Sequence, residues 1–299
     1  MSADYRLAAT LPASVRLDKG SGALPCLRVT SERHGTAEVY LHGAHMAAWH
    51  PRGRAPVIFL SRDSAFDPAK PIRGGVPICF PWFGPHGTDR QAPMHGFARI
   101  QPWTLTEAQD TPDAIALTFT LTDNERTRNS AWPHPFEATY RVTLGASLEM
   151  SLKVRNAGQA PVTFEEALHT YYAVKDVREI TIGGLENTDY LDKTDKFARK
   201  SQGASPVRIT GETDRIYLAT RATCTIDDPG LGRKITIGKT GSDTTVVWNP
   251  WIERAKAIAD IGDDEWVSFV CVETCNVGDA AVTLAPGAEH TIRATVTVA

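Results

Sequence analysis

The chain has 299 residues, of which 42% are hydrophobic and 22% are charged, and its formal net charge is −3. This composition is typical of a globular protein with a large core. Because no basic tract stands out, nucleic acid and anionic membranes are excluded as expected partners. No stretch is apolar for long enough to span a bilayer, and the N-terminus is not a convincing signal peptide.

Short β-strands are predicted along most of the chain. The expected strands are Cys26–Ser31, Thr36–Leu41, Val57–Leu60, Ala114–Thr122, Phe136–Leu144, Leu148–Val154, Val162–Val174, Glu179–Ile182, Val207–Ile209, Arg215–Leu218, Ala222–Ile226, Lys234–Ile237, Thr244–Trp248, Trp266–Glu273, Ala281–Leu284 and His290–Val298. Gly, Asp and Asn separate these runs, a pattern typical of an all-β antiparallel sandwich or barrel. One short helix is predicted over Pro250–Ile258, because Asn249 is a good N-cap and proline suits the first helical position.

No linker or internal repeat divides the sequence, so we expect one domain over residues 1–299. Residues 1 to about 22 match no strand pattern and are expected to be loosely ordered or to form a small edge element. Nothing indicates an assembly element, and we expect a monomer.

The five cysteines are an odd number and include no CxxC motif: Cys26, Cys79, Cys224, Cys271 and Cys275. Each has apolar or β-branched neighbours. Buried free thiols in a reducing compartment are the simplest explanation, which predicts a cytoplasmic protein.

The segment Pro71–Ile100 combines prolines, glycines and aromatic residues with Arg73, Arg99, His86 and His95. Its prolines exclude a regular helix, and its glycines permit tight turns and a close approach of ligand to backbone. Positive charge, imidazole and aromatic rings on a stiff loop suit a sugar, an anion, or both in one molecule. The alternative is that the two arginines are solvated or paired with carboxylates.

Two further residues have the chemistry of an acid/base pair. His169 lies in the strand-like run FEEALHTYYAV, where on its own it is best interpreted as a core histidine. Glu273 ends the predicted strand WVSFVCVET and shares a face with Phe269 and Cys271. A carboxyl group there lies either at a rim or buried, and burial would raise its pKa toward that of a general base.

Nine motifs in fixed order resemble those of one family. They are LHGAHMAAWHP (Leu41–Pro51), VIFLS (Val57–Ser61), KPIRGGVPICFPWFG (Lys70–Gly84), HGFAR (His95–Arg99), EALHTYY (Glu166–Tyr172), YLDK (Tyr190–Lys193), GETDRIYL (Gly211–Leu218), VVWNPW (Val246–Trp251) and FVCVE (Phe269–Glu273). With them the chain resembles the aldose 1-epimerase (mutarotase) superfamily, and more narrowly its glucose-6-phosphate 1-epimerase branch. The resemblance implies a large antiparallel β-sandwich, the galactose mutarotase-like supersandwich, with few short helices.

The resemblance also implies an isomerase that interconverts the α and β anomers of hexose 6-phosphates, without metal or organic cofactor. It makes His169 and Glu273 catalytic. Glu273 would take the proton of the O1 hydroxyl while imidazolium His169 protonates O5, so a carboxylate or phenol is expected near His169. It assigns the phosphate to Arg73 and Arg99, which match phosphate geometry bidentately.

The resemblance further assigns His95 and Asp214 to the sugar, although Asp214 would alternatively be a turn residue before a strand. Trp82, Phe83 and Trp248 would supply an aromatic face or, more simply, pack in the core. GLENTDYLDK (Gly184–Lys193) would cover the site or form a polar turn. No metal site is expected, because the spacing of His42, His45 and His50 fits no common zinc pattern.

Two other functions remain open from the sequence. One is a mutarotase of unphosphorylated aldoses, which would not need Arg73 and Arg99 beside the catalytic pair. The other is a non-catalytic carbohydrate-binding protein, which would be expected to lose His169 or Glu273.

Overall fold

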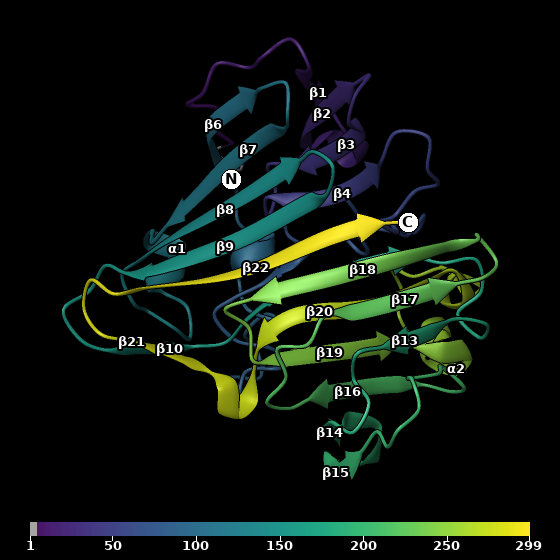
Figure 1. Cartoon of the computed structure of the whole chain (residues 1–299). Coiled ribbons are helices and arrows are strands. Elements are labelled where there is room, and N and C mark those ends of the chain that lie inside the picture. The colour runs from purple at the N-terminus through teal and green to yellow at the C-terminus, as the bar shows by residue number, and fades with distance from the viewer. Residues whose placement is uncertain (1–4) are drawn as a thin grey trace.

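The computed structural model describes residues 5–299, and residues 1–4 lie outside the described residues. Its strands form two eight-stranded sheets, a four-stranded sheet and a two-stranded sheet, and all pairs of named strands are antiparallel (Figure 1). The predicted all-β antiparallel sandwich is therefore confirmed. No helix of the described part is long and apolar enough to cross a membrane.

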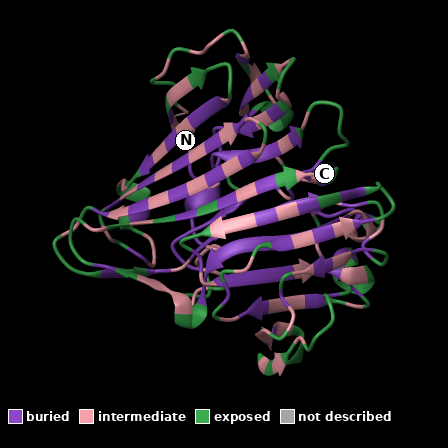
Figure 2. Cartoon of the chain, in the orientation of Figure 1, coloured by how far each residue is buried: buried purple, intermediate pink, exposed green. Residues whose placement is uncertain are grey.

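The first eight-stranded sheet runs diagonally through the view in Figure 1, from β6 near the top to β13 at the lower right. Its order is β13 (Thr181–Gly183), β17 (Cys224–Asp228), β18 (Arg233–Thr240), β22 (Glu289–Val298), β9 (Leu148–Asn156), β8 (Phe136–Leu144), β7 (Ile115–Thr122) and β6 (Thr104–Asp110). Along β8 and β9 buried residues alternate strictly with half-buried ones, which Figure 2 shows as alternating colours. This is the burial expected when one face of a strand packs on the core.

The second eight-stranded sheet carries most of the candidate site. Its order is β15 (Ala198–Ser201), β14 (Asp189–Asp192), β16 (Thr213–Tyr217), β19 (Thr244–Asn249), β20 (Phe269–Asn276), β11 (Glu166–Leu168) and β5 (Ile78–Cys79), with β12 (Tyr171–Ala173) also paired to β20. Val270 and Val272 of β20 belong to the same core cluster as Phe119 of β7 and Leu152 of β9. The main core therefore lies between the two large sheets.

The remaining strands form smaller sheets. These are the four-stranded β1 (Val15–Lys19), β2 (Pro25–Ser31), β3 (Gly35–Tyr40) and β4 (His45–His50), and the pair β10 (Val162–Phe164) and β21 (Val282–Leu284). Strand β1 pairs with β2 at the edge of its sheet. Of the two alternatives for the N-terminal segment, the structure has the small edge element over residues 15–19.

Helices are few and short, as predicted. They are α1 (Glu125–Arg128) and α2 (Trp251–Lys256), with 3-10 turns η1 (Ser21–Ala23), η2 (Ala98–Ile100), η3 (Lys193–Asp195), η4 (Glu265–Ser268) and η5 (Gly278–Ala280). The predicted helix is α2, and Asn249 Oδ1 accepts from the Trp251 backbone N–H at 2.9 Å. Helix α1 was not predicted, although Asn124 and Thr127 form a capping box that signals it.

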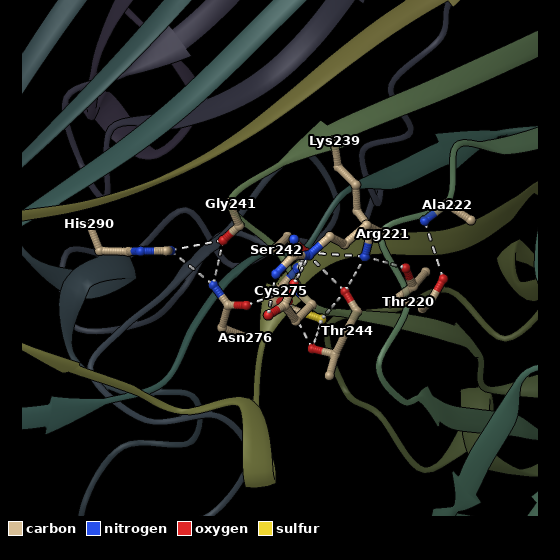
Figure 3. A network of polar contacts seen from close by, with 12 residues as sticks. Thr220, Arg221, Ala222, Lys239, Gly241, Ser242, Thr244, Cys275, Asn276 and His290 are labelled. Atoms are coloured by element: carbon tan, nitrogen blue, oxygen red, sulfur yellow. Dashed lines mark hydrogen bonds and ion pairs between the residues drawn. The ribbon is translucent and has the colours of Figure 1, made fainter.

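A polar network ties β20 to β22 and to the turn after β18 (Figure 3). Asn276 donates to Glu166 at 2.9 Å and to the carbonyl of Gly241 at 2.8 Å, and His290 Nε2 lies 3.1 Å from Glu166 Oε1. Burial raises the pKa of Glu166, and the hydrogen bond to Glu166 raises the pKa of His290. Asn276 ends β20, three residues beyond Glu273, and neither Asn276 nor Glu166 lines the cavity that holds the catalytic candidates.

Glu166→Gln should flatten the fall of stability with rising pH, which begins at the unfolded pKa of Glu166, about 4.5, and continues above that of His290, about 6.5. In the wild type both pKa values are raised, so the folded chain binds more protons than the unfolded chain and its stability falls as pH rises. The contribution of His290 is complete below its unfolded pKa of about 6.5 and is lost through its raised folded pKa. Loss of about 1 kcal/mol would lower Tm by about 2 °C in a chain of this size. Equal slopes in thermal unfolding of both proteins would contradict this.

Candidate functional site

A cavity of about 940 Å³ is lined by the loops around residues 71–100, by β16, β19 and β20, and by α2. All six residues selected from the sequence line it: Arg73, His95, Arg99, His169, Asp214 and Glu273. Segments far apart in the chain therefore meet at one concave site, as ligand sites commonly do.

Glu273 lies in the middle of β20, opposite Val246 of β19, and is only 1% exposed. The prediction that it ends a strand was wrong, because β20 continues to Asn276 and buries every residue. Neither carboxyl oxygen has a hydrogen-bond partner among the described residues. Burial and the nearby Asp214 raise the pKa of Glu273 well above its ordinary value, against the opposing charge of Lys193. An isolated buried carboxylate is costly, so this environment favours the protonated, neutral carboxyl group.

His169 lies at a break between β11 and β12, so the predicted strand Val162–Val174 is interrupted. Its backbone N–H donates to the carbonyl of Pro77 at 3.0 Å instead of to a neighbouring ladder. The break directs the imidazole at Glu273, with 3.4 Å between His169 Nε2 and Glu273 Oε1. The ring stacks on Tyr171 at a centroid distance of 5.0 Å and an interplanar angle of 12°.

The protonation of this pair differs from the sequence expectation. A carboxyl group and a phenol do lie beside His169, yet its pKa is well below the ordinary value. Burial is the largest cause, and the positive charges of Arg99 and Arg73 add to it. The two shifts together favour the form of the pair with its proton on Glu273 and a neutral imidazole on His169.

His95 is held in the left-handed region, with φ of 62°, where non-glycine residues are rare and often functional. Gly96 follows with φ of 76°, and a Cβ there would lie 2.1 Å from the carbonyl oxygen of Phe80. The backbone N–H of Gly84 donates to His95 Nδ1 at 3.2 Å. Since burial lowers the pKa of His95, the ring is neutral and carries its proton on Nε2, which is left as a donor. Its centroid is 5.5 Å from that of His169.

Arg73 is partly satisfied by the protein. Its Nε lies 3.0 Å from Asp260 Oδ1, and its Nη1 donates to the Tyr171 hydroxyl at 3.2 Å. Burial disfavours the charge of Arg73, but Tyr171 and Asp260 outweigh it and raise the pKa of the guanidinium. Arg73 therefore stays positively charged, and its side chain, which lines the cavity, is 22% exposed.

Arg99, in contrast, is a buried cation without a carboxylate. It lies in η2, is 7% exposed, and donates to the carbonyl of Met94 at 2.6 Å. Within residues 5–299 no carboxylate lies within ion-pair distance of it. Arg233 is buried to a similar extent, but it lies beside Asp228 and donates to three backbone carbonyls. Burial lowers the pKa of Arg99, which shows that its charge is poorly compensated by the protein groups around it.

Lys193 is a cavity residue that the sequence analysis did not select. It begins η3, directly after β14, and its Nζ lies 2.8 Å from Asp214 Oδ2. It also lies over the ring of Phe83 at 5.5 Å. The segment Gly184–Lys193 reaches the site through this lysine, and the YLDK motif was the signal that could have identified it. Burial raises the pKa of Asp214, and Lys193 opposes that rise.

Two of the three aromatic candidates line the cavity, and the third packs in the core. Phe83 and Trp248 line the cavity, and Trp248 lies edge-on to His169 with a centroid distance of 6.0 Å. Trp82 is 7% exposed, does not line the cavity, and donates from Nε1 to the carbonyl of Pro93. It therefore belongs to the core. Among residues 5–299 no group of three or more His, Cys, Asp or Glu side chains is arranged to hold a metal ion.

Comparisons with known proteins identify the family to which the chain belongs. The family model described as "Aldose 1-epimerase" matches residues 25–297. An Escherichia coli (strain K12) protein named "Putative glucose-6-phosphate 1-epimerase" is 37% identical over 238 residues, which cover 80% of this chain and 79% of that protein. A Cenchrus ciliaris protein of the same name is 36% identical over 265 residues, which cover 86% and 79%.

Solved structures show the same similarity. The crystal structure of a Salmonella typhimurium protein described as a "putative mutarotase" has a TM-score of 0.90 and 30% identity, and the match covers 97% of this chain and 95% of that one. Galactose 1-epimerase from Lactobacillus acidophilus NCFM has a TM-score of 0.73 at 13% identity, with 97% and 99% covered, and shares the fold.

Proposed function

Since this chain belongs to the aldose 1-epimerase family and acts on a small sugar, we propose that it interconverts the α and β anomers of hexose 6-phosphates, chiefly glucose 6-phosphate. One observation carries the phosphate assignment. The buried guanidinium of Arg99 has no carboxylate partner within residues 5–299, and it lines the same cavity as Arg73, His169 and Glu273. A phosphate dianion supplies the missing charge and accepts bidentate hydrogen bonds from both arginines.

The reaction proceeds by opening and reclosing the sugar ring. With the proton of the pair on His169, Glu273 accepts the proton of the O1 hydroxyl while His169 donates to O5. The C1–O5 bond breaks and gives the open-chain aldehyde. Rotation about C1–C2 presents the other carbonyl face, and the reverse transfers close the ring as the other anomer. These steps transfer protons and break and re-form the C1–O5 bond without any net change of oxidation state, so they need no electron acceptor.

The remaining cavity residues hold the sugar. His95 Nε2–H donates to a sugar oxygen near the ring, and Asp214 accepts from ring hydroxyls while Lys193 balances its charge. Phe83 and Trp248 offer apolar faces to the C–H side of the sugar. An unphosphorylated aldose has no anionic group that Arg99 could bind, which disfavours a general mutarotase. A carbohydrate-binding protein has no use for a buried His–Glu pair whose carboxyl oxygens lack hydrogen-bond partners within residues 5–299.

Saturation-transfer NMR of anomer exchange tests the function directly. We expect fast exchange on glucose 6-phosphate and slow exchange on free glucose and galactose, each measured against the enzyme-free rate because sugars mutarotate spontaneously. Fast exchange on the free sugars would favour the general mutarotase. Exchange at the spontaneous rate on every sugar would favour a binding protein.

Lys193→Met should lower kcat/KM for glucose 6-phosphate by about tenfold, the effect of one lost hydrogen bond to a charged group. The lysine opposes the raised pKa of Glu273, so its loss should also move the basic limb of the pH profile to higher pH. Lys193→Arg should retain most of the activity. A drop in rate without any change in the pH profile would assign Lys193 to packing alone.

We also propose that the chain is one domain over residues 1–299 that works as a monomer in the cytoplasm. All five cysteines are free and buried, which supports a reducing compartment.

A further inference from the structure

The charges around His169 are unbalanced in the unliganded protein. Arg73 and Arg99 contribute two positive charges, and Asp260 contributes one negative charge through its ion pair with Arg73. We call these three residues the anion cluster. The cluster therefore has an excess of positive charge next to the imidazole that must itself become positive to act as the acid.

We propose that the phosphate of the substrate acts as an activator as well as a handle: a dianion on the anion cluster makes His169 the acid of the pair. A separate oxyanion should then activate the protein toward a sugar that has no phosphate. This inference rests on the proposed function and adds a two-part reaction to it.

A direct physical connection joins the anion cluster to His169. Arg73 Nη1 donates to the Tyr171 hydroxyl at 3.2 Å, and the Tyr171 ring stacks on the His169 ring at 5.0 Å. His169 Nδ1 is buried without a partner among the described residues, so the ring is not held as imidazolium from that side. The charged or titratable groups that face it are Glu273, His95, Tyr171, Arg73, Arg99 and Lys193.

His169 and Glu273 are affected by different positive charges. Arg99 and Arg73 are the leading charges that lower the pKa of His169, whereas Lys193 is the leading positive charge that acts on Glu273. A bound dianion turns the cluster from net positive to net negative. The bound dianion therefore stabilises the imidazolium form of His169 more than any other charged form in the pair. Lys193 continues to stabilise the carboxylate form of Glu273.

The step is a single proton transfer within the pair. The O–H bond of the Glu273 carboxyl breaks, an N–H bond forms at His169 Nε2, and no other reactant is consumed. The two atoms are already 3.4 Å apart when Oε1 carries the proton. Substrates without phosphate leave the proton on Glu273. Even when such a substrate binds, His169 is then neutral and cannot donate a proton to O5.

The first test uses a substrate in two pieces: xylose, which lacks the exocyclic carbon of glucose, and phosphite dianion. We expect saturating phosphite to raise enzyme-catalysed anomer exchange of xylose by about tenfold or more, the lower end of what a hydrogen bond to a charged group changes. Enzyme-free samples with phosphite correct for buffer catalysis, and chloride at equal ionic strength corrects for salt. Arg99→Gln should abolish the activation, whereas Arg221→Gln, which changes an arginine whose side chain is 81% exposed, should retain it.

The second test measures the protonation state of the His169 ring directly. With ¹⁵N-labelled histidine, the His169 ring signals, assigned by their loss in His169→Gln, should move toward imidazolium when phosphite is added. Failure of phosphite to bind, or binding without exchange activation, or a ring that stays neutral at saturation, would overturn the inference. Each of these results leaves the proposed function intact if glucose 6-phosphate is still turned over. Absence of that turnover is the separate result that defeats the function.

Discussion

Glu273→Gln is expected to lower kcat for anomer exchange of glucose 6-phosphate by about 10²–10⁴-fold, the usual contribution of a general acid or base. The amide has nearly the same shape but cannot accept the O1 proton. Because burial favours the neutral form of the wild-type carboxyl group, the substitution should not unfold the protein. Exchange NMR and thermal unfolding of the same samples measure both effects.

The stability of this variant has its own pH signature. The folded pKa of Glu273 is raised, so the wild type loses stability as pH rises from the unfolded value of about 4.5 toward the folded value. Glu273→Gln lacks this loss and should gain Tm relative to the wild type at higher pH. Glu166→Gln is the matched control for activity alone, since Glu166 is also fully buried but does not line the cavity and should leave anomer exchange unchanged. Exchange by Glu273→Gln within tenfold of the wild type would remove Glu273 from the chemistry.

Arg99→Met should reduce the preference for glucose 6-phosphate over free glucose, measured as the ratio of kcat/KM values, by about 10²–10³-fold. A bidentate guanidinium–phosphate contact has hydrogen bonds to charged groups on both sides, each contributing about 1.5–3 kcal/mol. Arg99→Lys should recover part of the preference, because a point charge keeps the attraction without the two-pronged geometry. An equal loss on both sugars would indicate a structural role.

The same variant should change stability in the opposite direction to activity. The unliganded protein buries the Arg99 charge without a carboxylate among its described residues, so Arg99→Met is expected to raise Tm in the absence of ligand. Inorganic phosphate should raise the Tm of the wild type and not that of the variant. Arg221→Met, at an exposed position, should behave like the wild type.

Local patterns in the sequence were sufficient for most of the framework. Residues 136–144 and 148–156 alternate so regularly that the strands β8 and β9 follow from side-chain period alone. The motifs carried the family, which the match over residues 25–297 confirms. The predicted strand bounds were wrong where tertiary contacts, and not the alternation of apolar side chains, decide where a strand breaks or ends. The backbone N–H of His169 donates to the carbonyl of Pro77. Strand β20 continues past Glu273 because β11 pairs with it as far as Asn276 and β19 as far as Cys275.

The sequence by itself determined the fold class, the family and the residue types available for acid/base chemistry and anion binding. Only the tertiary structure decided that Lys193 joins the site, that Arg99 lacks a carboxylate within residues 5–299, and that burial raises the pKa of Glu273 and lowers that of His169. The physical reason is that hydrophobic period is a property of neighbouring residues, whereas desolvation and Coulomb energy depend on groups brought together from distant parts of the chain.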